Sequence, residues 1–266
     1  MSPWLRPLLA AEWRKVTTTK MLWFLSLVAV LYSSLQVVVL SLLASGLLPD
    51  APEMDDLLVD PDYITTLLAQ TGTAATFVLI LGIIAMTGEF RHMTITSTFL
   101  ASPRRSRVLV AKMLLYGALG AAIACVTMAF VVVAAFASLA PFEHAPITLS
   151  TIASVLAGAV IGMALYAVLG VSVGSLITNQ VAAIVTALVW VLLVEAVVGL
   201  AFPSAVRWLP GGALNSAMDV ALRADVMGEL SQADLLPPLG GMAVLLVYAA
   251  VFAAIASRTT LRRDVT

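Results

Sequence analysis

Long apolar runs that no proline interrupts constrain the fold of this chain more than any other feature of its sequence. All twelve prolines fall at the edges of these runs, because proline inside a helix removes a hydrogen bond and breaks it. A helix needs about 20 mostly apolar residues to cross a bilayer, and the stretch 152–202 has room for two spans around a polar break at 178–180. The sequence therefore predicts an all-α integral membrane protein with six transmembrane helices. They cover residues 21–43, 64–88, 108–139, 152–177, 181–202 and 239–257.

The composition also places most of the chain in a lipid bilayer. Hydrophobic residues make up 61% of the chain and charged residues only 11%, whereas about a quarter of the residues in soluble domains are charged. The formal net charge of −1 gives no reason to expect a nucleic-acid partner. With one cysteine and two histidines, we expect no metal site. No repeat or low-complexity linker divides the sequence, so residues 1–266 are expected to form a single domain.

Lys and Arg are distributed unevenly between the predicted loops. If the N-terminus is inside, twelve of them fall on the inner side and two on the outer side. Cytoplasmic loops carry the excess of Lys and Arg, so the sequence predicts a multi-pass protein of the plasma membrane with both termini in the cytoplasm. The inner residues are Arg6, Arg14, Lys15, Lys20, Arg91, Arg104, Arg105, Arg107, Lys112, Arg258, Arg262 and Arg263, and the outer ones are Arg207 and Arg223.

The segment 3–20, ahead of the first span, has the pattern of an amphipathic helix. Leu5, Leu9, Trp13 and Val16 share one helical face, and the basic residues lie mostly away from it. Such a helix is expected to lie in the inner membrane interface. The alternative is a basic flank without fixed structure, because periodicity in so short a window is ambiguous.

The loop between the second and third predicted spans, residues 88–112, mixes charges of both signs with apolar residues. Phe90, Phe99 and Leu100 are its large apolar side chains, and Pro103 is expected to end a short helix ahead of the arginines. A soluble partner could dock on such a loop. The alternative is that the arginines only set the topology and hold anionic lipid headgroups.

The order of residues in this loop is more specific than its composition. It reads GE-x-RH-x-TIT-x-TFL-x-x-PRR-x-RVL-x-AK and resembles the ABC-2 family of ABC transporter permeases, in particular a six-span branch that looks actinobacterial. Outside the loop the resemblance is architectural. The residues that carry it are Gly88, Glu89, Arg91, His92, Thr94, Ile95, Thr96, Thr98, Phe99, Leu100, Pro103, Arg104, Arg105, Arg107, Val108, Leu109, Ala111 and Lys112.

The resemblance implies the permease subunit of a type V-like exporter. Two permease copies, expected to be a homodimer, would each sit on a cytoplasmic ATPase subunit. A coupling helix at 95–100 would enter a groove of that ATPase, and the outer segment 203–236 would form partly re-entrant extracellular helices. The residues expected to couple the chain to the ATPase are Glu89, Arg91, Ile95, Thr98, Phe99, Leu100, Arg104, Arg105 and Arg107.

The chain itself has no G-x-x-x-x-G-K-[ST] loop to cradle nucleotide phosphates. We therefore expect no enzymatic activity and no cofactor in this chain, with ATP and Mg bound by the partner ATPase. The expected cargo is a drug, peptide, lipid or similar amphiphile. A serine hydrolase is a weaker alternative, because G-x-S-x-G occurs around Ser172 without the strand and turn that this motif needs.

Polar residues inside the predicted spans are candidates for a transport pathway. Thr65, Thr66, Gln70, Thr73 and Thr76 fall within roughly 140° of arc on a regular helix. Glu195 is the only acid deep in a predicted span, where an acid usually marks a pathway. The alternatives are that the threonines bond back to their own helix and that Glu195 is a packing residue. If Glu195 is a proton site, the chain would be an ion-coupled carrier instead of an ATP-driven one.

The fourth predicted span carries two pairs of glycines four residues apart. They are Gly158 with Gly162, and Gly170 with Gly174. This spacing lets neighbouring transmembrane helices approach closely. The pairs therefore predict that the fourth span packs tightly against its neighbours.

Overall fold

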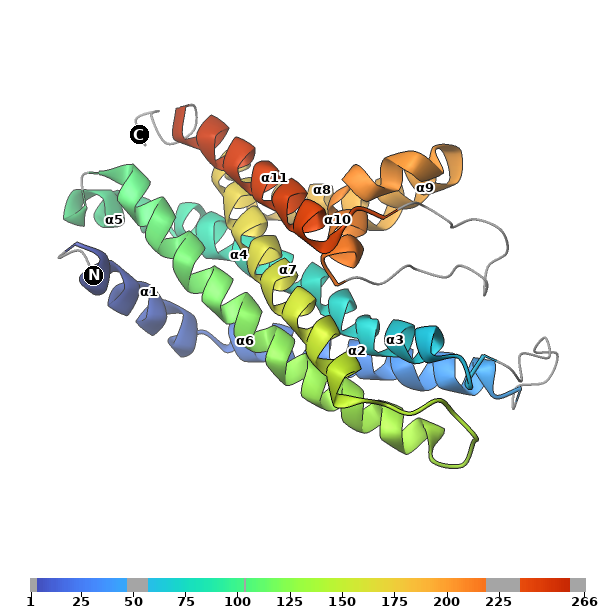
Figure 1. The fold of residues 1–266 in the computed structure, drawn as a ribbon. Helices are drawn as coiled ribbons and strands as arrows, with labels where there is room; N and C mark the ends of the chain where they lie inside the picture. Colours follow the sequence, from blue (N-terminus) through green and yellow to red (C-terminus); the bar gives the residue numbers. More distant parts are fainter. Residues whose placement is uncertain (1–3, 47–56, 103, 219–234, 259–266) are drawn as a thin grey trace.

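The computed structural model of the chain describes residues 4–46, 57–102, 104–218 and 235–258, and within these ranges it is helical without strands (Figure 1). The first half contains α1 (Leu5–Thr18), α2 (Lys20–Ala44), α3 (Pro61–Ala69), η1 (Gln70–Ala74), α4 (Ala75–Arg91), α5 (Ile95–Ala101) and α6 (Arg105–Leu139). The second half contains α7 (Leu149–Leu176), α8 (Gln180–Val189), η2 (Trp190–Val194), α9 (Glu195–Ala201), η3 (Pro203–Trp208), α10 (Pro210–Ala217) and α11 (Pro238–Arg258).

Six of the described helical segments are long and apolar enough to cross a membrane, which confirms the predicted number of spans. Each lies within three residues of its predicted bounds. The chain is thus built as a multi-pass membrane protein. The spans are Lys20–Ala44, Pro61–Arg91, Arg105–Leu139, Leu149–Leu176, Gln180–Ala201 and Pro238–Arg258.

Two of the six spans are not regular α-helices. The second span consists of α3, the 3₁₀ segment η1 and α4, and the fifth consists of α8, the π-helical segment η2 and α9. A 3₁₀ helix has three residues per turn instead of 3.6. The side chains of the second span therefore do not follow the single regular arc that the sequence analysis assumed.

The helix α7 lies at the centre of the bundle and contacts α4, α6, α10 and α11 (Figure 1). Its glycines make this packing close. A Cβ atom on Gly170 would collide with the backbone carbonyl of Leu79 on α4, and one on Gly174 would lie 2.7 Å from the carbonyl oxygen of Ile83. A Cβ atom on Gly158 would likewise collide with the backbone carbonyl of Ala217 on α10. The predicted role of these glycines in tight packing is confirmed.

One end of the bundle carries α1, α5, the start of α6 and the end of α11 (Figure 1). We call it the basic end, because the described Lys and Arg residues gather there, from Arg6 on α1 to Arg258 on α11. The opposite end carries η3 and α10, with Arg207 as its described basic residue. The predicted outer segment thus contains two short helices, and its residues 219–234 lie outside the described ranges.

The helix α1 occupies most of the predicted segment 3–20, but it presents a different face to the bundle. Glu12 and Val16, each 3% exposed, are its buried residues, whereas Trp13 is 51% exposed. Trp13, which shares the predicted apolar face with Val16, thus lies away from the bundle. The reason is electrostatic: the helix is rotated so that the carboxylate of Glu12 meets lysines inside the bundle.

Candidate functional site

Four charged side chains meet inside the basic end, and we refer to them as the charge cluster. They are Glu12 and Lys15 on α1, Glu89 on α4 and Lys112 on α6. Lys112 Nζ lies 2.6 Å from Glu12 Oε2 and 2.8 Å from Glu89 Oε1. Lys15 Nζ lies 2.7 Å from Glu12 Oε1 and 2.6 Å from the same Glu89 oxygen. Each lysine thus bridges both carboxylates, and the cluster joins three helices.

Three of the four groups are almost fully shielded from solvent. The side chains of Lys112, Glu12 and Glu89 are 1%, 4% and 6% exposed, and that of Lys15 is 43% exposed. Lys112 also donates a hydrogen bond of 3.1 Å to the carbonyl of Ala85. Burying a charge costs roughly several kcal/mol of desolvation free energy unless oppositely charged partners compensate for that cost. The two positive and two negative charges provide that compensation.

The environment of Lys15 keeps it charged. Partial burial by itself lowers the pKa of Lys15, but hydrogen bonds and ion pairs with Glu12 and Glu89 outweigh burial and raise the pKa above its ordinary value of 10.5. While both carboxylates are ionised, the ion pairs of Lys15 therefore stabilise the fold fully below pH 10.5, and this contribution is lost as the pH rises through the raised pKa. Lys15 does not act as a switch near neutral pH.

The helix α5 stands between the second and third spans, directly beside the charge cluster. Thr94, ahead of α5, donates its N–H to the carbonyl of Glu89 at 2.9 Å, and Ile95 is 1% exposed within the core of the bundle. Met93 and Leu100, in contrast, are each 79% exposed. Met93 also has a positive φ of 56°, which is uncommon for a residue other than glycine. The segment is thus anchored at one end and presents large apolar side chains outward.

The predicted coupling residues fall into two groups. Glu89 and Ile95 face inward and hold the bundle together in this conformation. Arg107 is half-buried and stacks over the ring of Trp4 at 5.1 Å, so it ties the start of α6 to α1. These three residues serve contacts within the chain rather than an open surface.

The other predicted coupling residues lie nearer the surface. Arg91 is exposed and donates a 3.2 Å hydrogen bond to Gln180. Leu100 and Arg104 are exposed, Thr98 and Arg105 are half-buried, and the hydroxyl of Thr98 donates to the carbonyl of Thr94 at 3.1 Å. The side chain of Phe99 lies outside the described part of the structure.

A groove at the basic end brings a second loop into this surface. It has a volume of about 600 Å³ and lies between the α4–α5 connection and the α7–α8 connection. The Arg91–Gln180 hydrogen bond joins its two sides. The sequence analysis treated 178–180 only as a break between spans and missed this role. The lining residues are Phe90, Arg91, Met93, Ile95, Thr178, Asn179, Gln180 and Val181.

Sequence reasoning also missed the charge cluster. Lys15 and Lys112 were counted only as residues that set the topology, and Glu12 was given no role. One signal was available: Glu12 is an acid in a basic segment, and Lys112 lies about two turns into a long apolar helix. Charges at such positions need partners, but the sequence does not say which partners they find.

The polar stripe of the second span is largely satisfied by its own helix. Thr65 and Thr66 donate to the carbonyls of Pro61 and Asp62, each at 3.0 Å. Gln70 donates to the carbonyl of Thr66, and Thr73 to that of Gln70. Thr73 also contacts the hydroxyl of Ser33 on α2 at 2.8 Å, while Thr76 is half-buried. In the described part of the chain, no hydrogen bond joins the stripe to Glu195.

Glu195 lies at the start of α9 and caps a different helix. Its Oε2 accepts a 2.9 Å hydrogen bond from the backbone N–H of Gly211, in the first turn of α10. A carboxylate at a helix N-terminus satisfies free N–H groups and the helix dipole. The other oxygen, Oε1, is buried and has no hydrogen-bond partner. The indole of Trp190 lies close to the same carboxylate but does not complete a hydrogen bond of ordinary geometry.

Comparisons with known proteins identify no relative: no protein-family model matches the chain, and no curated protein matches it. Within the described ranges, no group of three His, Cys, Asp and Glu side chains is arranged to hold a metal ion. Ser172, the candidate hydrolase serine, lies inside α7, and its hydroxyl donates to the carbonyls of Val168 at 2.8 Å and Ala249 at 3.2 Å. The features that remain for function are the basic end and Glu195.

Proposed function

We propose that this chain is the transmembrane subunit of an ATP-driven exporter of amphiphilic molecules, with ATP and Mg bound by a separate ATPase at the basic end. The observation that carries the proposal is the short helix α5 between the second and third spans. It is held to the bundle through Ile95 while Met93 and Leu100 remain exposed. The resemblance of the residues around α5 to the coupling segment of ABC-2 permeases points to the same function.

The chemistry of this surface fits a protein partner with an apolar pocket and an acidic rim. Met93 and Leu100 are the apolar anchors, and exposed Arg91 and Arg104 flank them. Protein interfaces typically combine a few buried apolar anchors with charges at the edge. The nearby groove between the two inner connections adds a concave surface of about 600 Å³, which could receive a loop or helix end of the partner.

The charge cluster provides a mechanical link between α5 and the membrane-spanning helices. Glu89 accepts a hydrogen bond from Thr94 through its backbone carbonyl and pairs with Lys15 and Lys112 through its carboxylate. A partner that shifts α5 therefore acts on α1, α4 and α6 together. Such packed elements move as units rather than deforming continuously. ATP-driven closure of the ATPase would in this way reorient the second and third spans.

The remaining assignments complete the proposed exporter. Two copies of the chain, as a homodimer, would enclose the pathway in the plasma membrane, with both termini in the cytoplasm. The helix α1 would lie in the inner membrane interface, where Trp13 is free to meet lipid. The short helices η3 and α10 would be the partly re-entrant outer helices.

Replacing Leu100 with glutamate tests the docking surface. We expect the variant to bind the ATPase that co-purifies with the wild-type chain at least about 10-fold more weakly, because a central apolar anchor contributes about 2 kcal/mol or more to an interface. Affinity would be measured with both proteins purified, the permease being held in nanodiscs. Leu149→Glu is the matched control, since Leu149 is 81% exposed at the opposite end of the bundle.

A stronger variant replaces residues 95–100 with a Gly/Ser linker. Loss of co-purification with the ATPase would support α5 as the coupling helix. Unchanged binding by both the linker variant and Leu100→Glu would overturn the assignment, provided that each variant still elutes as a folded protein.

The buried, unpaired Oε1 of Glu195 favours one other function, that of an ion-coupled carrier with Glu195 as its proton site. The two functions differ in their energy source. If the chain is a carrier, proteoliposomes that contain only this protein accumulate substrate under a pH gradient without nucleotide, and Glu195→Gln abolishes the accumulation. If it is an exporter subunit, these proteoliposomes are inactive and uptake requires the ATPase and ATP.

A further inference from the structure

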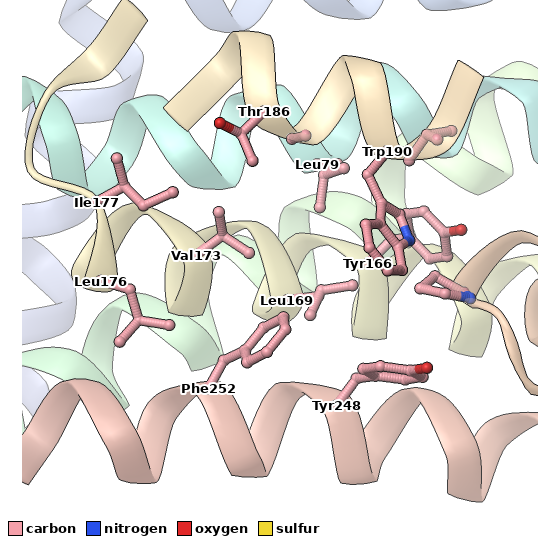
Figure 2. Close-up of a pocket in the computed structure, with 13 residues that line it drawn as sticks. Leu79, Tyr166, Leu169, Val173, Leu176, Ile177, Thr186, Trp190, Tyr248 and Phe252 are labelled. Carbon is pink, nitrogen blue, oxygen red and sulfur yellow. The ribbon is translucent and has the colours of Figure 1, made fainter. Parts of the chain in front are cut away.

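An apolar pocket with a volume of about 260 Å³ lies between α7, α8 and α11. Figure 2 shows Trp190 reaching toward it from the fifth span, Tyr248 and Phe252 reaching toward it from α11, and Leu169 and Val173 of α7 between them. We call this space the aromatic pocket. It shares no lining residue with the groove at the basic end, and no step of the proposed coupling uses it.

The residues that line the aromatic pocket favour an apolar ligand that packs against aromatic rings. Tyr166, Trp190, Tyr248 and Phe252 supply four aromatic rings to the lining. None of the described residues that line the pocket is charged, and the groups facing it are almost entirely apolar. Aromatic faces carry partial negative charge and attract cations, most strongly where water is excluded. The lining therefore accepts a bulky apolar ligand and favours a positive charge on it.

Glu195 is not one of the lining residues of the aromatic pocket, but it lies directly behind two of them. Its carboxylate is held between two elements that also line the pocket: the indole of Trp190 lies close to it, and Gly211, which follows Pro210 in the wall, donates its N–H to Oε2. The pocket thus has aromatic rings around it and an acid directly behind the part of its wall that Trp190 and Pro210 form.

No cation in the described part of the structure pairs with the carboxyl group of Glu195. Arg207 on η3 is the described basic residue at this end, but it stacks over Trp208 at 5.7 Å and forms no ion pair with Glu195. One carboxylate oxygen, Oε1, has no hydrogen-bond partner. An acid in the membrane is expected to pair with another group or with a ligand.

We propose that the aromatic pocket binds a lipophilic organic cation, whose charge lies beside Glu195 and whose apolar groups lie among the rings. If the exporter function proposed above is correct, this cation belongs to the class of cargo. A lipid chain would fill the apolar space but would leave Glu195 without a counter-charge, so the cation is the better occupant.

Binding is tested with the purified chain alone in nanodiscs, without ATPase or nucleotide. The probe is tetraphenylphosphonium, and its anionic counterpart tetraphenylborate has nearly the same shape. Equilibrium dialysis against empty nanodiscs corrects for partition into lipid. We expect saturable binding of the phosphonium ion only, with an affinity about 10-fold lower in Glu195→Gln, which corresponds to the loss of one close charge interaction.

The variants distinguish the charge of Glu195 from its structural role as a cap of α10. Glutamine keeps an oxygen that can accept the hydrogen bond from Gly211, so the cap on α10 is retained. Phe252→Ala removes a ring from the aromatic pocket and is expected to weaken binding several-fold while Glu195 remains. Phe130→Ala is the matched control, because Phe130 lies on α6 in a separate apolar groove lined by no acid among the described residues.

Equal binding of the phosphonium ion by wild type and Glu195→Gln would overturn the proposal. So would equal saturable binding of the two probes, or a loss of binding in Phe130→Ala as large as that in Phe252→Ala, since either result indicates partition into lipid or a non-specific apolar site. Failure of the exporter function would give a different result: the wild-type chain would bind no ATPase, or would bind it as tightly as Leu100→Glu and the linker variant do, with cation binding unchanged.

Discussion

Replacing Lys112 with methionine is expected to lower the free energy of unfolding by about 3–5 kcal/mol, the usual cost of removing one partner from a buried ion pair. Lys112 is 1% exposed and bridges Glu12 and Glu89. Methionine fills a similar volume, but it leaves these carboxylates with only Lys15 to neutralise them. The measurement is unfolding in mixed micelles, followed by circular dichroism as the fraction of denaturing detergent rises.

The same change at Lys20 is the control, because Lys20 is exposed at the start of α2. We expect Lys20→Met to change the free energy of unfolding by less than about 0.5 kcal/mol. A double variant, Glu12→Leu with Lys112→Met, removes one charge of each sign and leaves the 2.6 Å Lys15–Glu89 pair intact. It is expected to be more stable than Lys112→Met alone. If Lys112→Met were no less stable than Lys20→Met, the charge cluster would not hold the basic end together.

The six spans were predictable because they depend on local properties. Crossing a bilayer requires length and hydrophobicity in one continuous segment, and both can be read without knowing what the segment contacts. Even the ends of the spans agree, since proline and polar residues start and stop helices by local chemistry. Asn179, for example, caps the start of α8 by accepting a hydrogen bond from the N–H of Ala182 at 3.1 Å.

The charge cluster could not be predicted in the same way. Lys112 is 100 residues from Glu12, and Lys15 is 74 residues from Glu89. The positive-inside pattern already accounted for both lysines, and although the place of Lys112 in an apolar helix suggests a partner, nothing in the sequence identifies which residue that partner is. The rotation of α1 that buries Glu12 and exposes Trp13 depends on these distant partners, and apolar periodicity alone does not show which face meets the bundle.

The candidate pathway residues show a second reason why part of the site could not be predicted from the sequence. The predicted stripe assumed 3.6 residues per turn throughout the second span, but η1 is wound more tightly and most of the stripe hydroxyls bond to carbonyls of their own helix. Glu195 was correctly singled out as unusual. Its contact with Gly211 depends on how the chain folds back at η3, which no local pattern indicates.

The second large effect is expected at Gly170, where α7 touches α4. A Cβ atom there would collide with the carbonyl oxygen of Leu79 and lie 3.1 Å from the Cα of Gly82. Since only backbone atoms are in the way, no side-chain rotation relieves the contact and the two helices must separate. We expect Gly170→Ala to lower the free energy of unfolding by about 3 kcal/mol, the upper part of the usual range for overpacking.

A matched alanine substitution distinguishes this contact from the intrinsic preference of helices for alanine. Gly88, near the end of α4, has no atom within 4 Å of the position that a Cβ would take, so Gly88→Ala is expected to raise the free energy of unfolding by about 0.5–1 kcal/mol. If the two substitutions change the free energy of unfolding with opposite signs in the same micelle assay, the packing of α7 against α4 depends on their backbone contact. Equal effects would mean that they can separate without loss, and the second span would then be free to move relative to α7.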